Sequence, residues 1–199
     1  AAMLFTAGLS WKYILPVAAM IPPAAIVAWN FLLDDDKKNR ILAVIDPTLV
    51  EAADSWQQQR GLISIGNGGL WGNGVFMETG QFRYVPEVYN DFIFTYIGET
   101  VGFIGCLAVL LVLAFLCIRI LSNGLRAPDD LGKYICVGVF AMIGIQIIIN
   151  IGMCLGMMPV IGVTLPFLSA GGTSTGTLYL AIGVVLSVYV HSGKDMLFG

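Results

Sequence analysis

Three carboxylates stand where the sequence turns from polar to strongly apolar. Glu87 and Asp91 lie in the stretch YVPEVYNDFIF (84–94), and Glu99 follows in TYIGETVGFIG (95–105). Glu87 and Asp91 would share one helix face if the helix began early. An acid at such a place can accept a proton in catalysis, or it can cap a helix whose first free amides favour negative charge. Spacing alone leaves both interpretations of Asp91 open.

The elements that must position these acids are membrane helices. Hydrophobic residues make up 57% of the 199-residue chain and charged residues 12%, against about 25% charged residues in soluble domains. Residues 13–33, 100–118 and 134–193 contain no Asp, Glu, Lys or Arg, and about 20 apolar residues cross the hydrocarbon core. The sequence therefore predicts an all-α, polytopic transmembrane helical bundle. Its spans are expected over about 11–33, 96–121, 133–157 and 172–190.

Basic residues predict the orientation of these spans, because short cytoplasmic connections are enriched in Lys and Arg. They flank the spans at Lys12, Arg119, Arg126, Lys133 and Lys194. Alternating spans place all five on one side, assigned to the cytoplasm, so that the loop 34–95 faces outward. Residues 1–10 look like the end of an earlier helix, since they lack the basic start of a signal peptide.

The outer loop is predicted to be structured. Apolar residues at helix-like spacing between 41 and 50 indicate short amphipathic helices at the membrane surface. The stretch GNGGLWGNG (66–74) has two interpretations. Its backbone amides could approach a phosphate, but it lacks the ending of a P-loop. A tight turn around Trp71 is the favoured interpretation.

Polar residues within the apolar runs are few. Glu99 lies about two turns into the second span, where an ionisable group is costly unless it faces protein, water or a partner. Gln146 and Asn150 share a helix face, and they either join helices, which is the default, or contact a substrate. The four cysteines fall inside apolar runs without metal-ligand spacing, so no protein metal site is predicted. No basic patch suggests nucleic acid.

Three ordered stretches resemble a known family: WQQQRGLISIGNGGLWGNG, YVPEVYNDFIFTYIGETVGFIG and NIGMCLGMMPVIGVTLPFLSAGGTS. They are similar to motifs of the SEDS family, the bacterial membrane glycosyltransferases typified by RodA and FtsW. The resemblance implies the C-terminal half of a ten-span enzyme that polymerises lipid II into peptidoglycan. It also implies the bacterial cell membrane as location, with the active site on the extracytoplasmic side, and a role in cell elongation, division or sporulation.

The resemblance places the catalytic residue of the family on Asp91. It places further motif positions, taken as candidate substrate contacts, on Gln57, Glu87, Glu99, Gln146, Asn150 and Ser169. The sequence departs from the family pattern at Asn73, Asn90 and Ala170. These departures affect the details of substrate recognition more than the reaction class, since Asp91 and the Phe-Ile-Phe that follows it are intact.

The implied reaction assigns chemical roles. An acceptor hydroxyl needs a base, and Asp91 is expected to supply it. The leaving lipid pyrophosphate needs cations, from Arg40, Arg60 or Arg83 or from a divalent ion such as Mg²⁺ or Mn²⁺. A single displacement predicts inversion at the anomeric carbon.

Two other functions are compatible with the sequence. The chain could be a flippase or transporter of a lipid-linked precursor, with Glu99, Gln146 and Asn150 along its path. It could also be a scaffold for a partner transpeptidase of the class B penicillin-binding type, which SEDS enzymes usually accompany. The ionisable residues gather in the outer loop rather than in mid-membrane, and this favours the glycosyltransferase.

Overall fold

The computed structural model describes residues 2–8, 10–46, 52–74 and 89–198, and each regular element in these ranges is helical. The predicted all-α class is therefore confirmed. Two predicted site residues, Arg83 and Glu87, lie outside the described residues.

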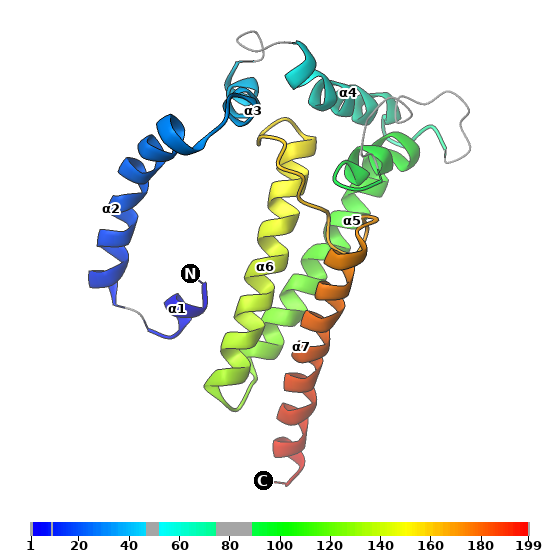
Figure 1. Cartoon of the computed structure of the whole chain (residues 1–199). Coiled ribbons are helices and arrows are strands. Elements are labelled where there is room, and N and C mark those ends of the chain that lie inside the picture. Colours follow the sequence, from blue (N-terminus) through cyan, green and yellow to red (C-terminus); the bar gives the residue numbers. More distant parts are fainter. Residues whose placement is uncertain (1, 9, 47–51, 75–88, 199) are drawn as a thin grey trace.

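Four stretches are long and apolar enough to cross a membrane: Lys12–Leu32, Ile93–Leu125, Asp130–Cys154 and Gly172–Ser192. They correspond to α2 (Trp11–Val27) continued by the π-helical turn η1 (Ala28–Leu32), α5 (Ile93–Leu125), α6 (Asp130–Cys154) and α7 (Gly172–Phe198). Figure 1 shows them running alternately up and down, with the long loop at one end of the bundle. The chain is a multi-pass membrane protein.

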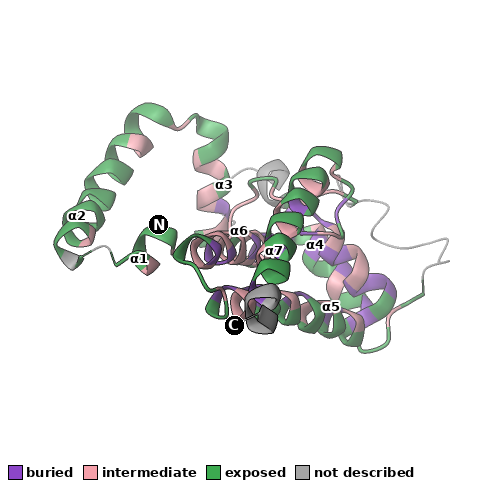
Figure 2. Cartoon of the chain, turned by 90° about the horizontal axis from the view of Figure 1, so that it is seen from below, coloured by how far each residue is buried: buried purple, intermediate pink, exposed green. Residues whose placement is uncertain are grey.

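Helices α5, α6 and α7 form the packed part of the molecule. One apolar cluster, around Phe92, Met153 and Leu165, lies at the end that carries the long loop, and a second, around Ile120 and Ile143, lies lower in the bundle. Helix α2 stands apart from these helices and has no buried residue among positions 12–27 (Figure 2). The short helix α1 (Ala2–Thr6) packs against α6, where the Met3 side chain lies over Gly138.

The ends of α6 follow from its sequence. Asp129 caps the N-terminus, and its carboxylate accepts a bond from the Gly132 N–H at 3.3 Å. After Cys154, Gly156 adopts a positive φ of 73°, which suits glycine at the end of a helix. Pro159 follows shortly after. The chain then crosses from α6 to α7 through the segment 155–171, called the α6–α7 link below.

Two helices form within the long loop, as predicted: α3 (Asp35–Ile45) and α4 (Ala52–Gly68). Helix α4 runs crosswise over the upper ends of α5 and α6 (Figure 1). Gln58 ties it to the end of α6, because its Nε2 donates to the carbonyls of Met153 (2.9 Å) and Met158 (2.8 Å). Helix α4 is thus fixed on top of the bundle.

Helix α5 is broken at Gly102, whose φ of 76° and ψ of −169° are not helical. The glycine-rich turn after α4 provides the hydrogen bonds that this break removes. Four backbone bonds join the two segments: Phe103 N–H to Gly69 (2.9 Å), Ile104 N–H to Leu70 (3.3 Å), Asn73 N–H to Glu99 (2.9 Å) and Gly74 N–H to Thr100 (2.9 Å). The tight turn expected around Trp71 is therefore present, and it is built for close backbone contact.

Candidate functional site

Asp91 lies just before α5, at the end of the bundle that carries α3 and α4. The residue is only 8% exposed, and the Phe92 ring that follows is fully buried. Its backbone carbonyl accepts a hydrogen bond from the Asn150 side chain at 2.7 Å and a weaker contact from the Cys154 thiol at 3.7 Å. Its position therefore depends on α6 as well as on its own helix.

Asn150 is fully buried one turn before the end of α6. Its Nδ2 donates to the carbonyl of Asp91 and also to that of Val163 in the α6–α7 link, both at 2.7 Å. A buried amide that donates to two carbonyls fixes both segments, since an unsatisfied buried carbonyl costs about 1–3 kcal/mol. The structure thus gives Asn150 a positioning role, in line with the default interpretation of a polar residue that joins elements.

The α6–α7 link covers the Asp91 carboxylate. Gly162 has a φ of 70°, and a Cβ atom at this position would lie 3.7 Å from Asp91 Oδ2. Gly162 itself is exposed, so on this side a residue without a side chain separates the carboxylate from the surface. The Arg40 guanidinium of α3 reaches the same link, with Nη1 donating to the Val160 carbonyl at 3.1 Å.

The rest of the link is fixed to itself and to the segment before Asp91. Ser169 is buried, and its Oγ accepts a bond from the Leu165 N–H at 2.8 Å. The next residue, Ala170, donates its N–H to the carbonyl of Tyr89 at 2.9 Å. Ser169 therefore shapes the link that lies over Asp91.

Glu99 faces protein rather than lipid. It is 2% exposed, and the Ser64 hydroxyl of α4 donates to its Oε2. Helix α4 therefore supplies the protein environment that was expected for this ionisable group. Gln146, one turn before Asn150, is half-buried in α6.

The other two described candidates lie on α4. Gln57 is half-buried beside Gln58. The Arg60 guanidinium carbon lies 5.5 Å from the centre of the Trp56 ring, a cation–π distance.

Sequence reasoning missed three residues that build this site: Gln58, Ser64 and Gly162. Gly162 could have been noticed as a glycine within the third of the three motifs. Nothing in the spacing distinguished Gln58 from its neighbours, because the carbonyls that it binds are about a hundred residues away in sequence. Ser64 looked like one small residue in a helix.

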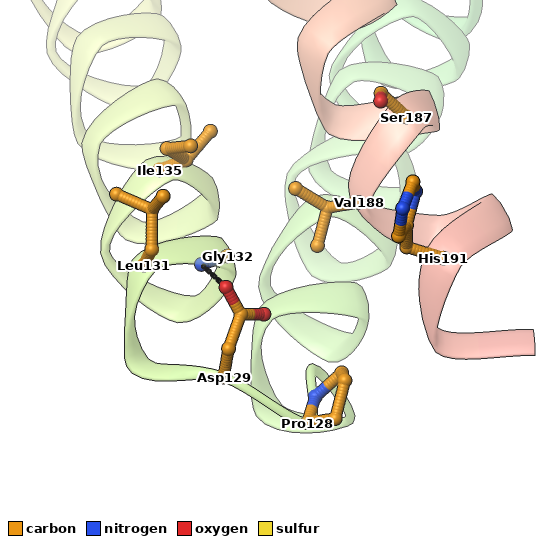
Figure 3. A pocket seen from close by; sticks show the side chains of 8 residues that line it. All are labelled: Pro128, Asp129, Leu131, Gly132, Ile135, Ser187, Val188 and His191. Atoms are coloured by element: carbon orange, nitrogen blue, oxygen red, sulfur yellow. Dashed lines mark hydrogen bonds between the residues drawn. The ribbon is translucent and has the colours of Figure 1, made fainter. Parts of the chain in front are cut away.

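Within the described ranges, no three His, Cys, Asp or Glu side chains gather to hold a metal ion. A cavity of about 330 Å³ lies at the opposite end of the bundle, between the α5–α6 turn and α7 (Figure 3). Its acid, Asp129, serves as the cap of α6. None of the predicted site residues lines this cavity, so it is not part of the site around Asp91.

The comparisons with known proteins agree with this architecture. A family model described as a cell cycle protein of the FtsW/RodA/SpoVE type matches residues 1–194. The chain belongs to the FtsW/RodA/SpoVE family. The resemblance carried by the three motifs is thereby confirmed.

Two relatives within the FtsW/RodA/SpoVE family show the extent of the match. Stage V sporulation protein E of Bacillus subtilis is 40% identical over 153 residues, covering 77% of this chain and 42% of that protein. Peptidoglycan glycosyltransferase MrdB of Escherichia coli (strain K12) is 34% identical over 194 residues, covering 95% of this chain and 51% of that protein. The chain thus spans about half the length of these relatives.

A solved structure has the same fold. A chain from a peptidoglycan synthase complex, described as coordinating polymerization and crosslinking, matches with a TM-score of 0.74 and 25% identity. The match covers 96% of this chain and 52% of that one.

Proposed function

We propose that this chain provides the C-terminal half of a peptidoglycan glycosyltransferase that polymerises lipid II, with Asp91 as the general base. One observation carries the proposal. Asp91, on which the resemblance places the family's catalytic residue, is a nearly buried carboxylate whose backbone is held by Asn150 and whose Oδ2 lies beside Gly162. The name of the Escherichia coli relative supports the reaction class.

In the proposed step, an acceptor sugar hydroxyl loses its proton to the Asp91 carboxylate as its oxygen attacks the anomeric carbon of the donor. The bond between that carbon and the lipid pyrophosphate breaks, and its electron pair leaves with the pyrophosphate. The α-linked donor becomes a β-linked glycan, so the configuration inverts.

The departing pyrophosphate needs positive charge. Among the arginines that the structure describes, Arg40 is the best placed to supply it, since it already reaches the α6–α7 link two residues before Gly162. Arg60, which stacks on Trp56, is a weaker candidate. A divalent ion such as Mg²⁺ or Mn²⁺ stays a prediction as a further source of positive charge. Substrate contacts by Gln57, Glu87, Glu99, Gln146 and Ser169 stay predictions.

The site is proposed to face the extracytoplasmic side. Asp91 and the α6–α7 link lie at one end of the bundle, and the turn with Arg126 and Lys133 lies at the other (Figure 1). Connections between spans that are rich in Lys and Arg usually lie in the cytoplasm. A base at the outer end of a span would meet lipid II where its sugar leaves the membrane. The proposed partner is a class B penicillin-binding transpeptidase, in line with the synthase complex that shares this fold.

The transporter alternative relied on Glu99, Gln146 and Asn150 along a path. In the structure, Glu99 bonds to Ser64 and Asn150 bonds to two backbone carbonyls. These contacts support a structural use of both side chains, so we do not adopt a transport function.

The test compares full-length wild type with Asp91→Asn in glycan formation from purified lipid II, with the cognate transpeptidase present. Asp129→Asn serves as the matched control, because it makes the same chemical change at the other end of the bundle and Asn still caps a helix. We expect loss of polymer only in Asp91→Asn. Normal polymer from Asp91→Asn would refute the base assignment. Lipid transport by a wild type that makes no polymer would favour the flippase.

A further inference from the structure

The placement of α4 relative to the spans fixes its depth. Its first half is bonded through Gln58 to the C-terminus of α6. Its other end packs on the break of α5, where a Cβ at Gly68 would lie 1.8 Å from the Gly98 carbonyl oxygen. Beyond Gly102, α5 continues to Leu125 for about 34 Å at 1.5 Å per residue, enough to cross a hydrocarbon core of about 30 Å. Both attachment points thus lie where the hydrocarbon ends.

A helix attached at two separated points to the same level lies parallel to the membrane plane. Figure 1 shows α4 crossing over the spans in this way. The glycine-rich turn after α4 then lies at the edge of the hydrocarbon, next to the break of α5.

The surface of this turn is apolar and strongly exposed. Trp71 is 80% exposed and Leu70 is 63% exposed. Phe103, Val101 and Ile104, which follow or flank the α5 break, are 60%, 45% and 44% exposed. No charged residue occurs between positions 61 and 77. Tryptophan is enriched at membrane–water interfaces, where its ring is apolar and its N–H reaches polar groups.

Backbone groups of the turn also form hydrogen bonds within the protein, which suits a medium poor in water. The amides of Gly72, Asn73 and Gly74 donate to carbonyls within α4 and α5. The carbonyls of Gly69 and Leu70 accept bonds from α5. Backbone groups in contact with lipid must be paired in this way. These amides are therefore not available to hold a phosphate.

We propose that Leu70 and Trp71 insert into the lipid interface on the Asp91 side of the membrane and anchor α4 there as a platform. The occupant of this surface is phospholipid, because the patch is uncharged, internally hydrogen-bonded and at the level of the hydrocarbon edge. The anchor fixes the height of α4, and with it the height of the upper part of α5 that begins just after Asp91.

The test is the depth of a spin label in the full-length protein reconstituted in phospholipid nanodiscs. The native cysteines are replaced, and a nitroxide is attached at Trp71→Cys. Reference labels are placed at Phe115→Cys, exposed in the middle of α5, and at Asp36→Cys, exposed in α3. Depth is the ratio of collision rates with oxygen and with a water-soluble nickel complex.

The label at Trp71 is expected to have a ratio several-fold above that of Asp36 and several-fold below that of Phe115. A ratio equal to that of Asp36 would overturn the proposal. Immobilisation of the label only when the partner transpeptidase is added would also overturn it and assign the patch to that protein. Leu70→Cys provides a second site should Trp71→Cys be unstable. The measurement does not involve Asp91, so it stands or falls separately from the proposed reaction.

Discussion

Replacing Asn150 by Leu tests whether α6 positions the base. Leucine has a similar size, so the change removes the amide donor without opening a large cavity. The carbonyls of Asp91 and Val163 would both lose a buried donor. At about 1–3 kcal/mol for each unsatisfied group, the cost is about 2–6 kcal/mol. The segment around Asp91 would shift to relieve it, and a displacement of about 1 Å can lower a rate by about 100-fold.

The assay is lipid II polymerisation by the full-length protein, with kcat and KM measured separately, together with thermal unfolding. Asn150→Leu is expected to lower kcat by about 10- to 100-fold and to lower the melting temperature, with KM little changed. Asn123→Leu is the matched control, since it makes the same chemical change at a half-buried residue near the other end of the bundle. A rise in KM with unchanged kcat and unchanged melting temperature would show that Asn150 contacts substrate instead, and would refute the positioning role.

Three further substitutions test the packing around the site. Gly68→Ala would place a Cβ against a backbone oxygen of α5 and should displace α4, lowering the melting temperature and the activity, whereas Gly66→Ala, with no atom within 4 Å, should be neutral or stabilising by up to about 1 kcal/mol. Ser64→Ala removes a donor from Glu99 and should destabilise by about 1–3 kcal/mol; a double-mutant cycle with Glu99→Gln that shows no coupling would contradict this. Gly162→Ala should lower kcat, because its φ of 70° costs about 1–2 kcal/mol for alanine and the new methyl would cover the carboxylate of the proposed base; unchanged kinetics would mean that substrate does not approach across this residue.

The spans could be predicted from sequence because hydropathy over twenty residues depends on composition alone. Asp91 could be singled out because a motif surrounds it. The role of Asn150 could not be decided from sequence, since its two acceptors lie 59 and 13 residues away and both are backbone groups. Every residue has a backbone carbonyl, so the residue type does not show which carbonyl accepts the bond.

The environment of Glu99 shows a different limit. Counted along an unbroken helix, Glu99 lies two turns inside the membrane. The structure breaks that helix at Gly102 and covers Glu99 with α4. The apolar pattern continues through the break without interruption, because the backbone bonds that replace the helical ones come from a turn about thirty residues earlier.

The bond from Asn150 to Asp91 also has a consequence for biogenesis. The ribosome makes Asp91 59 residues before Asn150, which at bacterial rates of about 5–20 residues per second is a delay of about 3–12 s. During that interval α5 can enter the membrane while the proposed base has no anchor. The site around Asp91 therefore becomes complete only when α6 and the segment that follows it have been inserted, so a nascent chain arrested before that point would carry the acid without the contacts that hold its backbone.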